Sequence, residues 1–183
     1  MKQSNRPTKV INLYGGPGTG KSTTGADLFA KLKIKKQNVE LVREYVKDWI
    51  WEGRILKSFD QVYILAKQAR KEQILYGVVD YVITDAPMWL SAIYEPKFGS
   101  FPYVCDQIVS KFEQEAHSRG VEFVHIFLNR VKPYQSEGRS QNEEEAKLID
   151  QELKDFLVRS KIPFAEVDAD DGAADAIIQL LGI

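Results

Sequence analysis

Hydrophobic residues follow two patterns that alternate along the chain: short unbroken apolar runs, and longer stretches with apolar residues three or four positions apart. The first pattern is typical of buried strands and the second of helices with one buried face. The runs predict strands at residues 10–13, 38–42, 78–84, 121–128 and 164–167. The spaced patterns predict helices at 22–32, 60–76, 103–116, from 142 onward and at 173–181. Strands that alternate with helices indicate a five-stranded parallel sheet covered by helices on both faces.

Two stretches depart from these patterns. Residues 89–101 are aromatic but contain Pro96, so we expect them to be partly irregular. Residues 129–141 are polar and contain a proline and a glycine, which predicts a surface loop. Asn142 is expected to cap the helix that follows, because Glu145 stands in the capping-box position three residues later.

Composition places few further bounds on the protein. A chain of 183 residues with 44% hydrophobic and 28% charged residues is expected to form one globular domain over residues 1–183. A formal net charge of −1 gives no overall basic field that would favour non-specific nucleic-acid binding. The single cysteine, Cys105, excludes an intrachain disulfide and is expected to be a buried thiol. Because no apolar run approaches the ~20 residues that span a bilayer, we expect a cytoplasmic protein without a membrane partner.

The strongest motif is Gly-Gly-Pro-Gly-Thr-Gly-Lys-Ser at residues 15–22, which fits the phosphate-loop pattern. A strand precedes it and a helix follows, so backbone N–H groups and the helix dipole converge on one point and favour a polyphosphate there. Lys21 is expected to reach the β- and γ-phosphates of ATP, and the Ser22 hydroxyl to ligate Mg²⁺. The residues expected to bind the triphosphate are Gly15, Gly16, Pro17, Gly18, Thr19, Gly20, Lys21, Ser22 and Thr23.

Acidic residues follow the second and third strands. Parallel strands end at the same edge of the sheet, so Glu44 and Asp85 are expected beside the phosphate loop. Asp85 is expected to hold Mg²⁺ with Ser22, although an aspartate here can also cap a helix or a turn. Glu44 is expected to accept a proton from an incoming hydroxyl group. The alternative for Glu44 is a surface charge or an ion pair with Arg43.

The polar segment from about 129 to 145 is typical of a lid that closes over the triphosphate. Arg130 and Arg139 are expected to stabilise charge on the transferring phosphoryl group, because the planar guanidinium pairs with two phosphate oxygens. Lys132 is a third candidate. The alternative is an ordinary solvated loop.

The arrangement around Glu44 resembles that of deoxynucleoside kinases, in which a glutamate after the second strand precedes a tryptophan, here Trp49. The resemblance implies that Trp49, Gln68 and Arg70 contact the acceptor. The chain departs from this family at Asp85-Ala86-Pro87, where those kinases carry Glu-Arg-Ser and thymidylate kinases carry Asp-Arg.

The whole pattern is similar to small P-loop kinases of bacterial viruses and to nicotinamide riboside kinase domains. The stretches that carry this similarity are Gly15–Ser22, Arg43–Tyr45, Ile83–Pro87 and Gly138–Ala146. Viral relatives phosphorylate deoxynucleoside monophosphates, or 5-hydroxymethyluracil within DNA during hypermodification. The similarity implies a bacteriophage protein that works in the host cytoplasm.

We therefore expect an ATP- and Mg²⁺-dependent kinase that phosphorylates a hydroxyl group of a nucleoside-like acceptor, either free or as a modified base in DNA. The alternative within the same class is a deoxynucleoside monophosphate kinase. An NTP-hydrolysing switch or a nucleotide sensor is the alternative of another class. The oligomeric state is not indicated.

Overall fold

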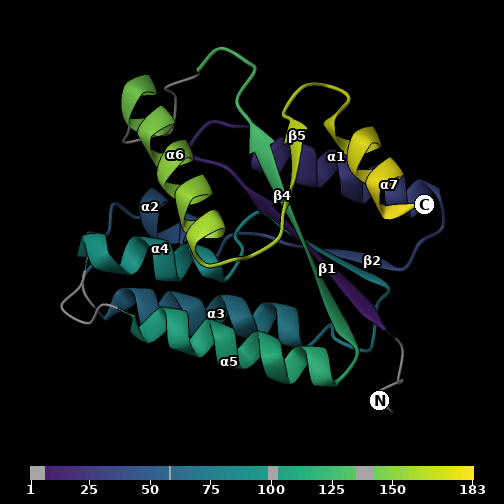
Figure 1. Ribbon diagram of the computed structural model, residues 1–183, viewed down its shortest axis with the longest axis horizontal. Helices are drawn as coiled ribbons and strands as arrows, with labels where there is room; N and C mark the ends of the chain where they lie inside the picture. The colour runs from purple at the N-terminus through teal and green to yellow at the C-terminus, as the bar shows by residue number, and fades with distance from the viewer. Residues whose placement is uncertain (1–6, 58, 99–102, 135–141) are drawn as a thin grey trace.

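The computed structural model describes residues 7–57, 59–98, 103–134 and 142–183. Its sheet has five parallel strands in the order β2-β3-β1-β4-β5, with helices on both faces (Figure 1). This confirms the α/β P-loop fold expected from the sequence. The strands are β1 Thr8–Tyr14, β2 Val39–Val42, β3 Tyr81–Thr84, β4 Val121–Asn129 and β5 Ala165–Asp168.

The helices divide between the two faces of the sheet. One face packs against α1 and α7, and the other packs against α3, α4, α5 and α6 (Figure 1). The helices are α1 Lys21–Ile34, α2 Lys47–Trp51, α3 Asp60–Gln73, α4 Trp89–Phe98, α5 Val104–Ser118, α6 Glu143–Arg159 and α7 Ala173–Leu181.

The central strand β1 holds the two halves of the core together. Ile11 and Leu13 pack towards α1 and α7, whereas Tyr14 packs with the helices of the opposite face. Side chains of a strand alternate between the faces of a sheet, and both faces are covered here, so nearly every residue of β1 is buried. The phosphate loop that follows β1 is therefore anchored to a strand that is buried on both faces of the sheet.

The expectation of partly irregular structure at residues 89–101 is wrong for its first ten residues, because α4 runs through Trp89–Phe98 with Pro96 inside it. Trp89 and Ala92 are buried against the core, and the carboxylate of Glu95 accepts a hydrogen bond from the Cys105 backbone N–H. These tertiary contacts outweigh the local cost of proline in a helix. Residues 99–101 lie outside the described residues.

Other local expectations hold at their centres and shift at their ends. Cys105 is fully buried, and Asn142 and Glu145 form the capping box at the start of α6. Strand β3 begins three residues later than expected, because the N–H groups of Val78 and Val79 both bind the Leu75 carbonyl in a turn.

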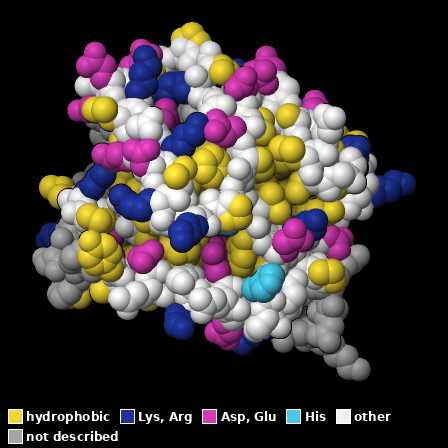
Figure 2. All heavy atoms as spheres, viewed as in Figure 1, with side chains coloured by type: hydrophobic (Ala, Val, Ile, Leu, Met, Phe, Trp, Pro, Cys, Tyr) yellow, Lys and Arg dark blue, Asp and Glu magenta, His cyan; other side chains and the backbone are white. Residues whose placement is uncertain are grey.

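The surface carries no dominant charge on the face that Figure 2 shows, where basic and acidic side chains are interspersed. This agrees with the formal net charge of −1. Within the described ranges, none of the helices combines the length and apolar character needed to cross a membrane.

Candidate active site

The phosphate loop leaves β1 at Tyr14 and enters α1 at Lys21. Gly15 and Gly20 have φ values of 146° and 104°. Such positive φ values favour glycine, because a residue with a Cβ atom would clash with its own backbone there. A Cβ added at Gly15 would lie 2.7 Å from Thr19 Oγ1, so the tight turn needs glycine for space as well. Gly20 is the N-cap of α1 and uses no side chain to cap it, so the first N–H groups of the helix are available to an anion.

Lys21 folds over this loop. Its Nζ donates hydrogen bonds to the carbonyls of Gly15, at 2.5 Å, and of Gly16, at 3.0 Å. The ammonium group is thus held at the mouth of the loop, where the motif predicts that it meets the β- and γ-phosphates.

Ser22 and Asp85 come together from α1 and the end of β3. Ser22 Oγ donates to Asp85 Oδ2 at 2.6 Å, and Asp85 Oδ1 accepts the backbone N–H of Glu44 at 3.0 Å. Asp85 is 6% exposed, so its carboxylate is buried between Ser22 and the segment after β2. A hydroxyl and a carboxylate at this separation provide two hard oxygen ligands, and Mg²⁺ takes such ligands beside phosphate oxygens and water. The donor set therefore fits Mg²⁺.

Glu44 lies partly buried at the end of β2. Burial raises the pKa of its carboxyl group, the nearby charge of Asp85 adds to the rise, and Lys21 and Lys47 oppose it. Glu44 therefore lies within electrostatic reach of both the phosphate-loop lysine and the candidate magnesium ligand. A carboxylate with a raised pKa is a stronger base than an ordinary glutamate, which is the property that proton abstraction needs.

Arg130 follows β4 and crosses to the phosphate loop. Its Nε donates to Asp150 Oδ2 at 2.8 Å, and its Nη2 donates to the Pro17 carbonyl at 2.8 Å. Asp150, from α6, also accepts the backbone N–H of Gly16 at 2.5 Å. The Arg130 side chain is only 9% exposed, and its Nη1 is buried without a hydrogen bond among the described residues. Arg130 is thus held at the loop itself. Arg139 lies outside the described residues.

The predicted acceptor residues occupy different places. Trp49 is 8% exposed and packs inside an aromatic cluster with Tyr45 and Tyr63. Of these residues, Tyr45 directly follows Glu44 in the chain. Gln68 is 3% exposed, and its amide is engaged on both ends. Its Oε1 accepts the Tyr45 N–H at 3.2 Å, and its Nε2 donates to Thr84 Oγ1 at 3.2 Å. Gln68 therefore joins the segment after β2 to the end of β3.

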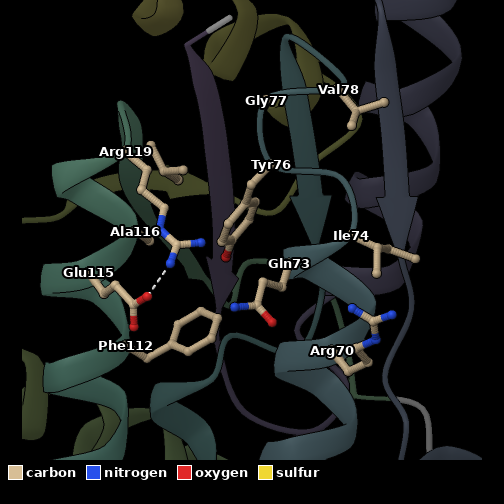
Figure 3. A pocket seen from close by; sticks show the side chains of 11 residues that line it. Arg70, Gln73, Ile74, Tyr76, Gly77, Val78, Phe112, Glu115, Ala116 and Arg119 are labelled. Atoms are coloured by element: carbon tan, nitrogen blue, oxygen red, sulfur yellow. Dashed lines mark hydrogen bonds and ion pairs between the residues drawn. The ribbon is translucent and has the colours of Figure 1, made fainter. Parts of the chain in front are cut away.

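Arg70 lies elsewhere. It lines a hollow of about 410 Å³ between the end of α3 and the end of α5, together with Gln73 and Arg119 (Figure 3). Val78, in the turn before β3, and Val121, the first residue of β4, line the same hollow. The phosphate loop follows the carboxyl end of β1, so the structure does not bring Arg70 together with the other site residues.

Two residues of the site were not foreseen. Asp150 contacts the phosphate loop through the backbone N–H of Gly16. Tyr94 of α4 lies near Glu44: burial raises the pKa of the Tyr94 hydroxyl to about 12, and the negative charge of Glu44 adds to the rise. Asp150 left a signal in the sequence, because it falls on the buried stripe of α6 four residues after Ala146 and three before Leu153. An acidic residue on a buried stripe needs a partner. Tyr94 left none, because its contact depends on how α4 packs.

Fold and site together define an α/β protein with a phosphate loop, the kind of domain that binds a nucleoside triphosphate. The family model for an AAA domain matches residues 10–174, and the chain belongs to that family. No curated protein matches the chain significantly.

Solved structures show the same fold at low sequence identity. NadR protein in complex with NR superposes with a TM-score of 0.70 at 19% identity, and the match covers 96% of this chain and 52% of that one. NadR protein in complex with NAD and AMP-PNP superposes with a TM-score of 0.66 at 17% identity, and the match covers 96% of this chain and 50% of that one. The Mycobacterium tuberculosis APS kinase CysC Cys556Ala mutant superposes with a TM-score of 0.56 at 16% identity, and the match covers 97% of this chain and 99% of that one. The chain thus spans about half the length of the NadR chains that it matches.

Proposed function

We propose that this protein is an ATP-dependent kinase that transfers the γ-phosphate to a hydroxyl group of a nucleoside-like acceptor, either free or as 5-hydroxymethyluracil within DNA. The observation that carries the proposal is the position of Glu44. Its backbone N–H donates to Asp85 Oδ1 at 3.0 Å, and the other oxygen of Asp85 accepts the Ser22 hydroxyl of the phosphate loop at 2.6 Å. The fold shared with NadR and an APS kinase, and the sequence resemblance to nicotinamide riboside kinase domains, support a kinase.

The residues divide the work as follows. Lys21 and the N–H groups at the start of α1 hold the triphosphate, and the buried Nη1 of Arg130 is a donor still available for one of its oxygens. Ser22 and Asp85 would hold Mg²⁺, which when bound neutralises charge on the phosphates. Arg139 is proposed from the sequence as the lid cation.

Glu44 then determines the kind of acceptor. As the acceptor oxygen bonds to the γ-phosphorus, its proton passes to the Glu44 carboxylate and the bond from phosphorus to the bridging oxygen of ADP breaks. A hydroxyl acceptor needs this base, whereas a phosphate acceptor arrives already ionised. The alternative is a deoxynucleoside monophosphate kinase. In such an enzyme Glu44 would only orient the phosphate acceptor and would not take a proton from it.

The fate of the γ-phosphate tests the proposal. Purified protein is incubated with γ-labelled ATP and Mg²⁺ together with nucleosides, nucleotides, or DNA that contains 5-hydroxymethyluracil, and the Lys21→Ala variant serves as control. Label in an ester on a hydroxyl group supports the proposal. Label in a nucleoside diphosphate favours the phosphate-acceptor alternative. Label only in inorganic phosphate favours a switch, and label that stays in ATP under every condition favours a sensor.

A further inference from the structure

Three aromatic rings beside Glu44 form one cluster. Trp49 and Tyr63 stack with centroids 5.6 Å apart and planes at 20°, and Tyr45 meets each of them edge-on at 6.1 Å and 6.0 Å. Trp49 forms the inside of the cluster, while Tyr63 is 45% exposed. Tyr63 therefore presents more of its surface to solvent than the buried Trp49 does.

Each ring of the cluster carries a cation. The guanidinium carbon of Arg54 lies 3.8 Å from the centroid of Trp49. The Nζ atoms of Lys67 and Lys71 lie 5.3 Å from the rings of Tyr63 and Tyr45, respectively. We call Arg54, Lys67 and Lys71 the ring cations.

The ring cations also lack acidic partners. Many other lysines and arginines form ion pairs, such as Lys31 with Asp175 and Lys154 with Glu166. Over the described part of the chain, no carboxylate lies within 4.0 Å of the charged nitrogens of any ring cation. Lys71 Nζ donates to the Arg43 carbonyl at 3.2 Å, but no carboxylate neutralises the charge of the ring cations among the described residues. Their positive charge is therefore concentrated beside a partly exposed aromatic surface.

This surface is joined to the reacting groups through the backbone. The Tyr45 N–H donates to Gln68, and the neighbouring Glu44 N–H donates to Asp85. Tyr45 directly follows the proposed base in the chain, and Lys71 lies over its ring. Lys47 adds a further positive charge close enough to act on Glu44.

We propose that the acceptor is a nucleotide unit: a base that packs against Tyr63 and carries a phosphate that binds Arg54 and Lys67. This rests on the proposed function, and it narrows the acceptor class. A cationic ring, such as a pyridinium nucleoside, is repelled by the ring cations, and a neutral nucleoside leaves them without a partner. Arginine suits the phosphate because its guanidinium can pair with two oxygens while its face lies on Trp49. The nucleotide is either free or part of a strand.

Binding measurements test this without any transfer step. A saturating concentration of adenylyl imidodiphosphate with Mg²⁺ fills the phosphate loop, so that added nucleotides cannot bind there. Calorimetry then compares each common nucleoside with its 5′-monophosphate, a pyridinium nucleoside, and a short single strand of the same base. The Arg54→Gln/Lys67→Gln variant keeps the side-chain bulk without charge. Lys33→Gln is the matched control, because Lys33 lies 5.2 Å from the Phe29 ring on α1, away from the cluster.

We expect a monophosphate to bind about tenfold more tightly than its nucleoside, because each charge contact is worth a few-fold. The difference should shrink in high salt and in the double variant, but not in Lys33→Gln. Equal binding of the strand and the monophosphate indicates a free nucleotide, and tighter binding of the strand indicates a nucleotide in a polymer. Equal binding of nucleoside and monophosphate, tighter binding of the pyridinium nucleoside, or an unaffected double variant overturns the proposal. If transfer to a hydroxyl is absent while the binding preference holds, the proposed function fails and the nucleotide site stands.

Discussion

Ser22 Oγ lies 2.6 Å from Asp85 Oδ2, although the two residues are 63 positions apart in the chain. Strands β1 and β3 are neighbours and parallel, so the segments that follow them end at the same edge of the sheet. This contact is what makes the phosphate loop and the acidic residue one site.

Ser22→Ala and Asp85→Asn should each raise the Mg²⁺ concentration needed for half-maximal turnover, by about tenfold, as loss of a metal-positioning group commonly does. Turnover measured against Mg²⁺ checks this. Asp27→Asn is the control, because Asp27 pairs with Lys31 within α1. An unchanged magnesium dependence in both site variants would remove these residues from the metal site.

Lys21→Ala should abolish phosphate transfer, by at least about 10²-fold, because the charge that faces the triphosphate is lost. The variant also loses two hydrogen bonds to the loop carbonyls, so a small loss of thermal stability is expected. Circular dichroism and a turnover assay measure the two effects separately. A folded variant with near-normal turnover would contradict the phosphate-loop role.

Arg130 and Asp150 should act as a pair on the phosphate loop, because both contact its backbone. Arg130→Ala and Asp150→Ala should each raise the KM for ATP, and the double variant should be no worse than the poorer single one. Residues in direct contact typically show coupling of about 0.5–3 kcal/mol. Additive effects in this double-mutant cycle would mean that the ion pair does not position the loop.

Glu72 should make the fold less stable as the pH rises. Its carboxyl group is fully buried in the core, and burial raises its pKa to about 8. A group whose pKa is raised on folding binds its proton more tightly in the folded state. The contribution of Glu72 to the free energy of unfolding is therefore fully present below about pH 4. This contribution is lost as the pH rises from about 4 to about 8, with a slope of at most about 1.4 kcal/mol per pH unit.

Urea denaturation between pH 5 and pH 8 measures this effect, with the exposed residue Glu122 changed to Gln as a control. Glu72→Gln, which stays neutral, should flatten the curve, although the half-buried Glu113, whose pKa is raised to about 7, will keep part of the slope. A curve for Glu72→Gln that matches the wild type would show that Glu72 does not ionise in this range.

The sequence was sufficient for the fold because the buried strands are marked by unbroken apolar runs and the phosphate loop by its glycines. It was also sufficient for the residues at strand ends, since a parallel sheet brings Ser22, Asp85 and Glu44 to one edge. It was not sufficient for α4, where burial of Trp89 and Ala92 outweighs Pro96.

The remaining gaps concern packing between distant segments. Lys21 was expected to reach the phosphates of ATP, and the structure shows that its Nζ also binds the carbonyls of its own loop. Trp49 and Gln68 were expected to face an acceptor, and their surroundings depend on how α3 lies against the segment after β2. No local pattern encodes such contacts. The ring cations were not predicted for the same reason, because the sequence does not show which aromatic ring a helical lysine packs against.

The central claim is that Glu44 takes the proton of a hydroxyl acceptor. Glu44→Gln keeps the shape of the side chain and removes its basic oxygen, so it isolates the proton transfer. With the acceptor from the labelling experiment, single-turnover transfer followed by ³¹P NMR should show a phosphomonoester whose formation is slower in the variant by about 10²-fold or more. ATP affinity should barely change. A variant that forms product at close to the wild-type rate, or a product that is a nucleoside diphosphate, would contradict the claim.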